Sequence, residues 1–135
     1  MNFGFLILNY QAEKRQNAMK ENLIRDKSYR FALSIIDLYK ILVAQKEYVM
    51  SKQLLKSGTS IGANVEEVLA GQSRADFLSK MSIASKEARE ARYWLHLLRD
   101  SNTLDTKHLI HLIQESESLI NILTSIVKTT SIKTA

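Results

Sequence analysis

The chain has 135 residues, of which 19 are lysine or arginine and 14 are aspartate or glutamate, so its formal net charge is +5. This length suits one domain, and the absence of cysteine excludes disulfides, thiolate metal sites and thiol catalysis. With no proline and only four glycines, the composition predicts an all-helical protein. The absence of cysteine suits a reducing cytoplasm. The isoelectric point near 9.5 favours acidic partners such as nucleic acid.

The N-terminal segment does not follow the apolar period of the rest. Its run MNFGFLILNY lacks the features of a signal peptide and is far shorter than the roughly 20 apolar residues that span a membrane, so we expect no membrane association. We divide the chain into an N-terminal extension at 1–20, a domain at 21–130 and a tail at 131–135. Met19 is a candidate biological start, because the codons for residues 13–15, Glu-Lys-Arg, can form a purine-rich ribosome-binding site. Finding residues 1–18 in protein from the native source would exclude that start.

Two helices are predicted in the first half of the chain, from apolar residues that recur every three or four positions. The first covers 22–44, and its apolar stripe is wide enough to face two neighbouring helices. The second follows a short connection at 45–47 and ends near Gly71, a natural position for the left-handed residue past a helix end.

Two further helices are predicted in the second half. Ser73 caps the third helix, which ends just before Asn102. Thr103 or Asp105 caps the fourth, and the polar sequence from Lys128 onward is expected to fray. Four amphipathic helices with short connections predict an antiparallel up-and-down four-helix bundle of long helices.

The second helix combines an apolar face with small and polar residues. Gly58 and Gly62 allow another helix to approach closely, which has to offset a cost of about 1 kcal/mol for each glycine in a helix. Polar residues at helical spacing form what we call the polar seam: Ser57, Ser60, Asn64 and Glu67. A hydrogen-bond network that fixes helix register is the favoured interpretation of this seam, and a catalytic role for its carboxylate is the less favoured one.

Aromatic residues on the third helix suggest a subunit interface. Tyr93 and Trp94 are adjacent, so their side chains diverge by about 100° and cannot both enter one core. One of them is a candidate interface anchor, together with Gly58 and Gly62 on the second helix. The alternative is that both aromatic residues merely flank the core.

Basic residues follow helical spacing on two helices. Four lie on the third helix and two, one turn apart, on the second, and we treat the six as candidate nucleic-acid-binding residues: Arg89, Arg92, His96, Arg99, Lys52 and Lys56. Lysine and arginine bind phosphates, and a ring of subunits would repeat such a stripe around its axis. The alternative is that these are solvated charges, some of them paired with Glu87 or Glu90.

No residue pattern points to catalysis, a cofactor or a metal. His108, His111 and Glu115 share one side of the fourth helix, but a closed metal site needs further ligands. The sequence also lacks a phosphate-binding loop and a serine-histidine-acid arrangement. We therefore expect no enzymatic activity, no cofactor and no metal.

Several blocks in order resemble the four-helix-bundle family of proteins encoded in intervening sequences of bacterial 23S ribosomal RNA genes. The blocks are RFALSIIDLYK (30–40), KEYVMSKQLLKSGTSIGANVEE (46–67), GQSRADF (71–77) and KEAREARYWLHLL (86–98), within a resemblance that covers roughly 19–125. The resemblance implies a long bundle that assembles into a homopentameric barrel. Relatives include the accessory variability determinant of diversity-generating retroelements, a basic pentamer that binds nucleic acid and a reverse transcriptase.

These observations predict a cytoplasmic, non-catalytic, basic scaffold that forms a ring, which the resemblance implies is a pentamer. The scaffold is expected to bind RNA or DNA mainly through phosphate contacts, alone or with another protein. The alternative is a protein-protein interaction or structural assembly module that does not bind nucleic acid.

Overall fold

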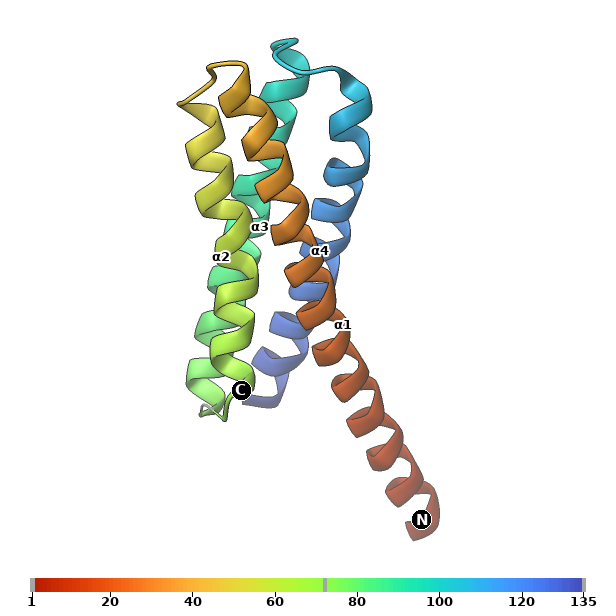
Figure 1. The fold of residues 1–135 in the computed structure, drawn as a ribbon. Helices are drawn as coiled ribbons and strands as arrows, with labels where there is room; N and C mark the ends of the chain where they lie inside the picture. Colours follow the sequence, from red (N-terminus) through yellow and green to blue (C-terminus); the bar gives the residue numbers. More distant parts are fainter. Residues whose placement is uncertain (1, 72, 135) are drawn as a thin grey trace.

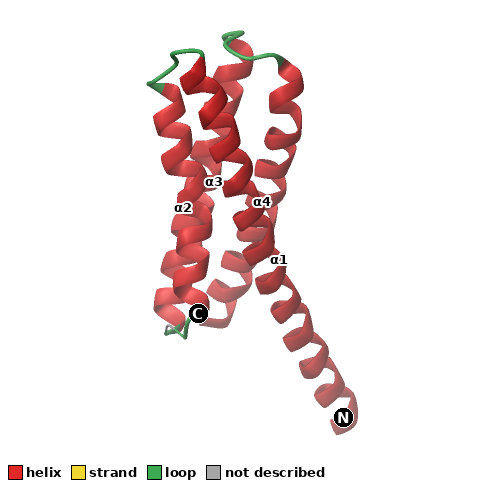
Figure 2. Ribbon diagram, in the orientation of Figure 1, coloured by secondary structure: helices red, strands yellow, loops and turns green. Residues whose placement is uncertain are grey.

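The structure is a computed structural model that describes residues 2–71 and 73–134, the last two of these by their backbone alone. Its helices are α1 (Phe3–Ala44), α2 (Met50–Leu69), α3 (Arg74–Asp100) and α4 (Thr106–Thr134). They run alternately up and down, and the described residues between them form short connections (Figures 1 and 2). Each helix packs against the next in the chain, and α1 also packs against α4. The predicted all-α, up-and-down four-helix bundle is confirmed for the single chain.

The core follows the predicted three-and-four spacing on every helix. On α3, Ala84, Ala88 and Ala91 are fully buried, and their small side chains let the neighbouring helices approach closely. The largest fully buried side chains come from all four helices: Ile24, Ile35, Leu42, Leu54, Ile61, Val65, Met81, Leu95, Leu98, Leu109, Leu119 and Leu123.

The two glycines of α2 lie against α1 of the same chain. A Cβ atom at Gly58 would lie 2.8 Å from Cγ1 of Ile35, and one at Gly62 would lie 3.4 Å from the carbonyl oxygen of Ser28. Gly58 is buried, so it is not available to a second subunit. The close approach that both glycines permit is used within one bundle, which argues against an interface role for Gly58. Gly62 is only partly buried, and its assignment to a subunit interface stays a prediction.

The residues predicted to end and to cap helices do so in the α2–α3 and α3–α4 connections. Gly71 has φ 101°, and the Ser73 side chain accepts a hydrogen bond from the backbone N–H of Asp76 at 3.2 Å. Asn102 has φ 57°, a left-handed conformation that stops α3. Of the two candidate caps for α4, Asp105 accepts a hydrogen bond from the backbone N–H two residues later at 3.2 Å.

Glu47 in the first connection holds the start of α2, a role that the sequence analysis missed. Its carboxylate accepts backbone N–H bonds from Val49 at 3.3 Å, Met50 at 3.0 Å and Ser51 at 2.7 Å. Partial burial alone would raise the pKa of Glu47, but these hydrogen bonds together outweigh it and lower that pKa. The carboxylate therefore satisfies N–H groups that a new helix leaves without intrahelical partners.

The start of α1 differs from the prediction. The helix begins at Phe3 rather than near residue 22, and its first half projects away from the bundle (Figure 1). We call residues 3–19 the arm and residues 20–44 the body of α1. The side chains of Phe3 and Leu8 are 76% and 62% exposed. The arm has no buried face and hence no apolar period, but many of its residues are good helix formers that extend the packed helix.

The end of α4 also differs from the prediction. The helix continues through Thr134 instead of fraying from Lys128, and the Thr130 hydroxyl donates to the carbonyl oxygen of Ile126 at 2.8 Å. Residue 135 of the predicted tail lies outside the described residues. Over the part of the chain that the structure describes, none of the helices is apolar over enough of its length to cross a membrane.

Candidate nucleic-acid interface

Two basic residues of α3, Arg89 and Arg99, lie toward α4. The Arg89 guanidinium donates a hydrogen bond from Nη2 to Oγ1 of Thr124 at 3.3 Å. At the other end, hydrogen bonding to Asp100 and, more weakly, the charge of Glu117 on α4 raise the pKa of Arg99. The stripe predicted on one helix is therefore a boundary between two helices.

A shallow groove of about 280 Å³ lies at the Arg89 end of this boundary. We call it the α3–α4 groove, and it is lined by Ser82, Ser85, Arg89, Thr124, Val127 and Lys128. Two cationic side chains and three hydroxyls thus face one hollow, and none of the described residues that line it carries a carboxylate. Cations and hydroxyls are the groups that contact nucleic-acid phosphates.

Lys128 is a basic residue of the groove that was not among the candidate nucleic-acid-binding residues. It was assigned to a fraying tail, whereas the structure continues α4 past it and places it beside Arg89. Its basic charge is visible in the sequence, but its place opposite α3 depends on where the last helix ends.

The other end of the stripe is weakened by its own neighbours. Nε and Nη2 of Arg99 donate to the two carboxylate oxygens of Asp100 at 2.8 and 3.3 Å, and the same hydrogen bonding lowers the pKa of Asp100. Arg92 and His96 are partly buried between the two ends. The available positive charge of the stripe is therefore greatest near Arg89.

Lys52 and Lys56 of α2 do not join the α3 stripe. Lys56 lies near Glu87, whose pKa is raised first by partial burial and then by Glu90, while the charges of Lys86 and Lys56 act in the opposite direction. Lys56 therefore lies on the α2 side of α3, whereas Arg89 contacts α4. The candidate basic residues therefore lie in two separate places, one on the α4 side of α3 and one on its α2 side.

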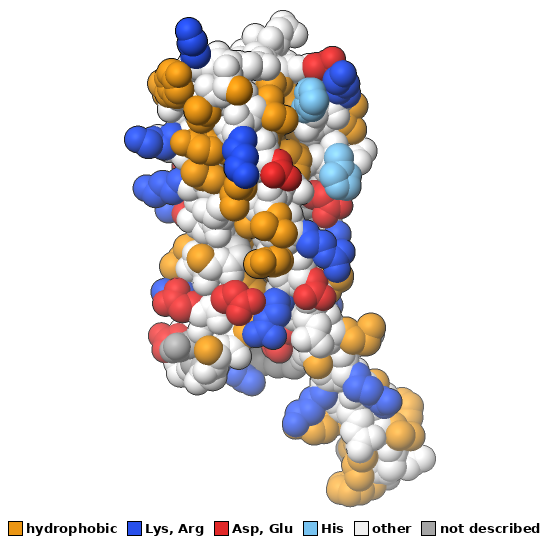
Figure 3. All heavy atoms as spheres, in the orientation of Figure 1, with side chains coloured by type: hydrophobic (Ala, Val, Ile, Leu, Met, Phe, Trp, Pro, Cys, Tyr) orange, Lys and Arg blue, Asp and Glu red, His pale blue; other side chains and the backbone are white. Residues whose placement is uncertain are grey.

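The α2 lysines instead belong with two lysines at the α1–α2 connection. We call these four exposed residues the loop-end lysines: Lys40, Lys46, Lys52 and Lys56. At about 1.5 Å per residue, Lys40 lies about 6 Å before the end of α1 and Lys56 about 9 Å after the start of α2. Figure 3 shows several lysine or arginine side chains over this end of α1 and α2. Lys40 and Lys46 were not predicted, because the spacing of charges along one helix does not show which charges gather across a connection.

The polar seam does not form the predicted network between helices. The side chains of Ser57, Ser60 and Asn64 donate to carbonyl oxygens four residues earlier in α2, at 3.1, 2.6 and 2.8 Å. Glu67 is exposed, and its Oε1 lies 3.2 Å from Nζ of Lys80 on α3. Only this ion pair links the seam to a neighbour among the described contacts, so most of the seam satisfies its own backbone.

Tyr93 and Trp94 diverge as their adjacency requires. Trp94 packs against the core, and its buried Nε1 has no hydrogen-bond partner among the described residues. Tyr93 is 55% exposed, and its ring meets the Trp94 ring edge-on with centroids 5.2 Å apart. Of the two, Tyr93 is the one that a second subunit could reach.

The possible metal ligands on α4 do not gather into a site. His108 and His111 are exposed, and Oε2 of Glu115 lies 3.3 Å from Nζ of Lys27 on α1. Within residues 2–71 and 73–134, no group of three histidine or acidic side chains is placed to hold a metal ion.

Fold and surface together define a basic, all-helical four-helix-bundle protein. The family model of the 23S rRNA-intervening sequence protein matches residues 20–125, so the chain belongs to this family. It is also similar to a solved structure from Bacteroides thetaiotaomicron, described as a protein of unknown function from the S23 ribosomal protein family. That similarity has 49% identity and a TM-score of 0.77, and covers 81% of this chain and 98% of the other. A comparison with curated proteins gives no match.

Proposed function

We propose that this protein acts without catalysis as a self-associating basic scaffold that binds nucleic acid, principally RNA, through phosphate contacts. The observation that carries the proposal is the α3–α4 groove, where Arg89 and Lys128 face one hollow with three hydroxyls. The family name associates these proteins with ribosomal RNA genes and supports RNA as the first ligand to test.

Phosphate binding at this groove is expected to depend on charge more than on base sequence. The guanidinium of Arg89 has five N–H donors, of which one is directed at Thr124, and Lys128 adds an ammonium. Binding that neutralises phosphates releases counterions, so affinity should fall steeply as salt rises.

Self-association would multiply a modest charge. Apolar side chains on the outside of α1, α2 and their connection are exposed, Tyr29 by 63% and Val49 by 74%, and Figure 3 shows apolar side chains gathered on this face. A ring of subunits would bury these apolar side chains between copies. Their exposure on the single chain therefore supports the homopentameric ring that the family resemblance implies. Each added copy would bring another α3–α4 groove to the same nucleic-acid molecule. Several linked weak sites bind a ligand more tightly than a single site does.

A mobility-shift titration of the purified protein with single-stranded and structured RNA, at low and physiological salt, tests the proposal. Changing Arg89 and Lys128 to glutamine together should weaken binding at least about tenfold, while the charge-matched control with Arg30 and Lys86 to glutamine should change it less than about threefold. Absence of binding at low salt, or equal losses in both double variants, would refute the groove as the site.

Lys52→Gln with Lys56→Gln tests whether the loop-end lysines also contribute. We expect this variant to lose less affinity than the groove variant, because these lysines are solvated and one of them lies near Glu87. Its affinity should also depend less steeply on salt than that of the unchanged protein, since fewer phosphates are neutralised. A loss that exceeds that of the groove variant would move the main site to the loop end.

The second candidate function is a protein-binding or structural assembly module, favoured by the exposed apolar residues of the arm and of the outer α1–α2 face. A partner that remains bound after nuclease treatment and at high salt would favour this function. Light scattering of the purified protein measures the number of subunits, and a monomer at micromolar concentration would exclude self-association.

A further inference from the structure

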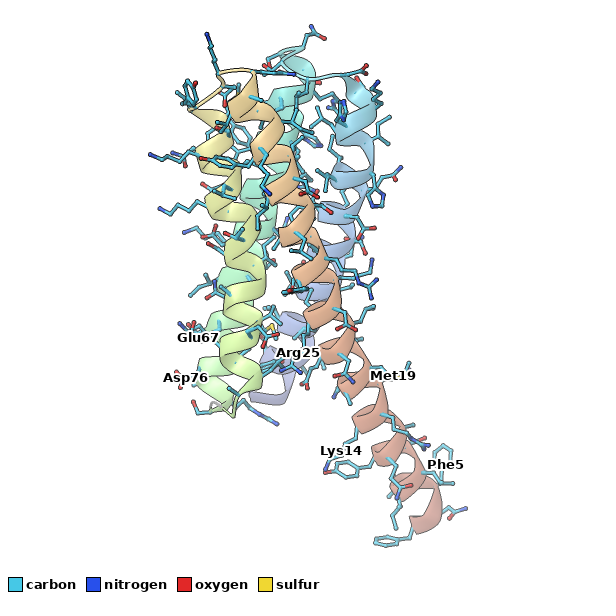
Figure 4. All side chains as sticks on the ribbon, viewed as in Figure 1. Phe5, Lys14, Met19, Arg25, Glu67 and Asp76 are labelled. Carbon is cyan, nitrogen blue, oxygen red and sulfur yellow. The ribbon has the colours of Figure 1, made fainter. Side chains whose placement is uncertain are left out.

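A cavity of about 320 Å³ opens where the arm leaves the bundle. Residues of α1, α3 and α4 line it: Asn17, Lys20, Glu21, Arg74, Phe77, Ile126, Thr129 and Thr130. Figure 4 labels Met19, which directly precedes Lys20 in the chain, Arg25, one helical turn after Glu21, and Asp76 on the first turn of α3. The arm of α1 diverges from the other helices at this end of the bundle (Figure 1).

The polar lining of the cavity combines two cations with groups that recognise hydroxyls and amines. Nζ of Lys20 donates to Oγ of Ser125 at 2.9 Å, which fixes the ammonium and leaves two of its three donors for a ligand. Arg74 contributes a second positive charge. Glu21 can accept hydrogen bonds, and Asn17 can both donate and accept them.

The apolar lining belongs to this end of the core. Ile126 is buried, and Phe77 is partly buried and packed against the core, so its ring is held in place. A fixed aromatic ring beside a polar rim is a surface on which a planar base can stack. The lining therefore includes an aromatic ring on which a base could stack and cations that could bind an anion.

We propose that this cavity binds a phosphomonoester that carries a nucleobase, as in a nucleoside monophosphate. A phosphomonoester carries close to two negative charges at neutral pH, which suits Lys20 and Arg74 together. Glu21 disfavours a bare phosphate but accepts hydrogen bonds from a ribose hydroxyl or a base amine. The volume lies within the range of about 300–1,000 Å³ that small-molecule sites occupy.

Two sources share this chemistry, a free nucleotide and the 5′ end of a nucleic-acid strand. The strand-end form rests on the proposed nucleic-acid function, whereas the free-nucleotide form does not. The α3–α4 groove variant separates the two questions, because Arg89 and Lys128 do not line this cavity.

Calorimetric titration of the full chain with adenosine and uridine monophosphate, adenosine and inorganic phosphate tests the proposal. Both monophosphates should bind, and adenosine and phosphate should each bind at least about tenfold more weakly. Lys20→Gln and Arg74→Gln should each weaken monophosphate binding about tenfold, whereas the controls Lys86→Gln and Arg92→Gln should change it less than about twofold. Phe77→Leu should weaken the monophosphates and leave inorganic phosphate unchanged.

Strand ends are tested with one oligonucleotide carrying either a 5′ phosphate or a 5′ hydroxyl. The strand end is identified as the ligand if the 5′-phosphorylated form binds more tightly than the 5′-hydroxyl form. This preference should be lost in Lys20→Gln and kept in the variant of Arg89 and Lys128. Equal binding of the two forms, with free monophosphates still bound, identifies the free nucleotide.

The proposal is overturned if neither monophosphate binds at millimolar concentration, or if Lys20→Gln binds them as the unchanged protein does. Far-ultraviolet circular dichroism of each variant checks its fold, and Lys20→Gln keeps the test decisive even if Arg74→Gln does not fold.

Discussion

The arm and the body of α1 belong to one continuous helix but have opposite surroundings. In the arm, large apolar side chains such as Phe3 and Leu8 face solvent, whereas in the body Ile35 and Leu42 are fully buried. Backbone hydrogen bonds and helix propensity are sufficient to continue a helix that packing has already formed. The difference teaches that being helical and contributing to stability are separate properties of a segment.

The largest expected effect compares one isoleucine from each region. Ile35→Ala should lower the free energy of unfolding by about 2–5 kcal/mol, because it leaves a cavity in the core beside Gly58. Ile7→Ala in the arm should change it by less than about 0.5 kcal/mol, since that side chain is 44% exposed. Urea denaturation of both variants measures the difference, and equal losses would show that the arm is packed in solution.

The two glycines of α2 test the packing of the body of α1, because both lie against it. Gly58→Ala should destabilise the protein by about 1 kcal/mol, because overpacking against Ile35 costs more than the helix propensity that alanine adds. Gly62→Ala should be neutral or stabilise by up to about 1 kcal/mol, since its Cβ meets Ser28 at 3.4 Å. Thermal denaturation compares the two variants, and the reverse order would contradict the close approach of α1 at Gly58.

The connection that follows the body of α1 predicts a pH-dependent effect. Glu47→Gln should cost about 0.5–1 kcal/mol at pH 7, because the hydrogen bonds to the first turn of α2 lose their charge. The pKa of Glu47 is lowered in the folded state, so its contribution is present above the ordinary glutamate value of about 4.3 and is lost as pH falls through the folded value. Urea denaturation at pH 7 and below pH 4 should show the gap between the two proteins shrinking on acidification. A gap that grows would contradict the cap.

The smallest effect is expected from removing the arm. A chain that begins at Met19 should unfold within about 0.5 kcal/mol of the full chain, because it keeps every residue of the described core. Denaturation curves of the two chains and their sedimentation provide the measurement. A loss above about 1 kcal/mol, or a change in subunit number, would show that the arm is covered in solution.

Local patterns predicted the bundle well because its helices are amphipathic and its connections are short. Gly71, Ser73 and Asn102 each act at the position that turn and cap chemistry requires. The start of α1 was missed because apolar periodicity records packing, and the arm is helical without packing. Glu47 was missed because it caps α2 from outside the helix, with no Ser or Asp at the usual position.

The candidate site was harder to predict because it depends on which helix faces which. Helical spacing placed Arg89 in a basic stripe, but Lys128 lies nearby only through the packing of α4 on α3. Lys56 shares the sequence signal of Arg89 and nevertheless lies on the α2 side of α3. Gly58 showed a need for close approach without showing that α1 of the same chain supplies the partner.

Trp94 gives this molecule a spectroscopic probe of its own. It is the only tryptophan of the chain, and its indole N–H is shielded from water, so the folded protein should emit at shorter wavelength than the unfolded one. Tyr93, in ring contact with it, should pass excitation energy to the indole. One fluorophore on α3 can therefore follow the opening of the bundle in real time, without a dye or an engineered label.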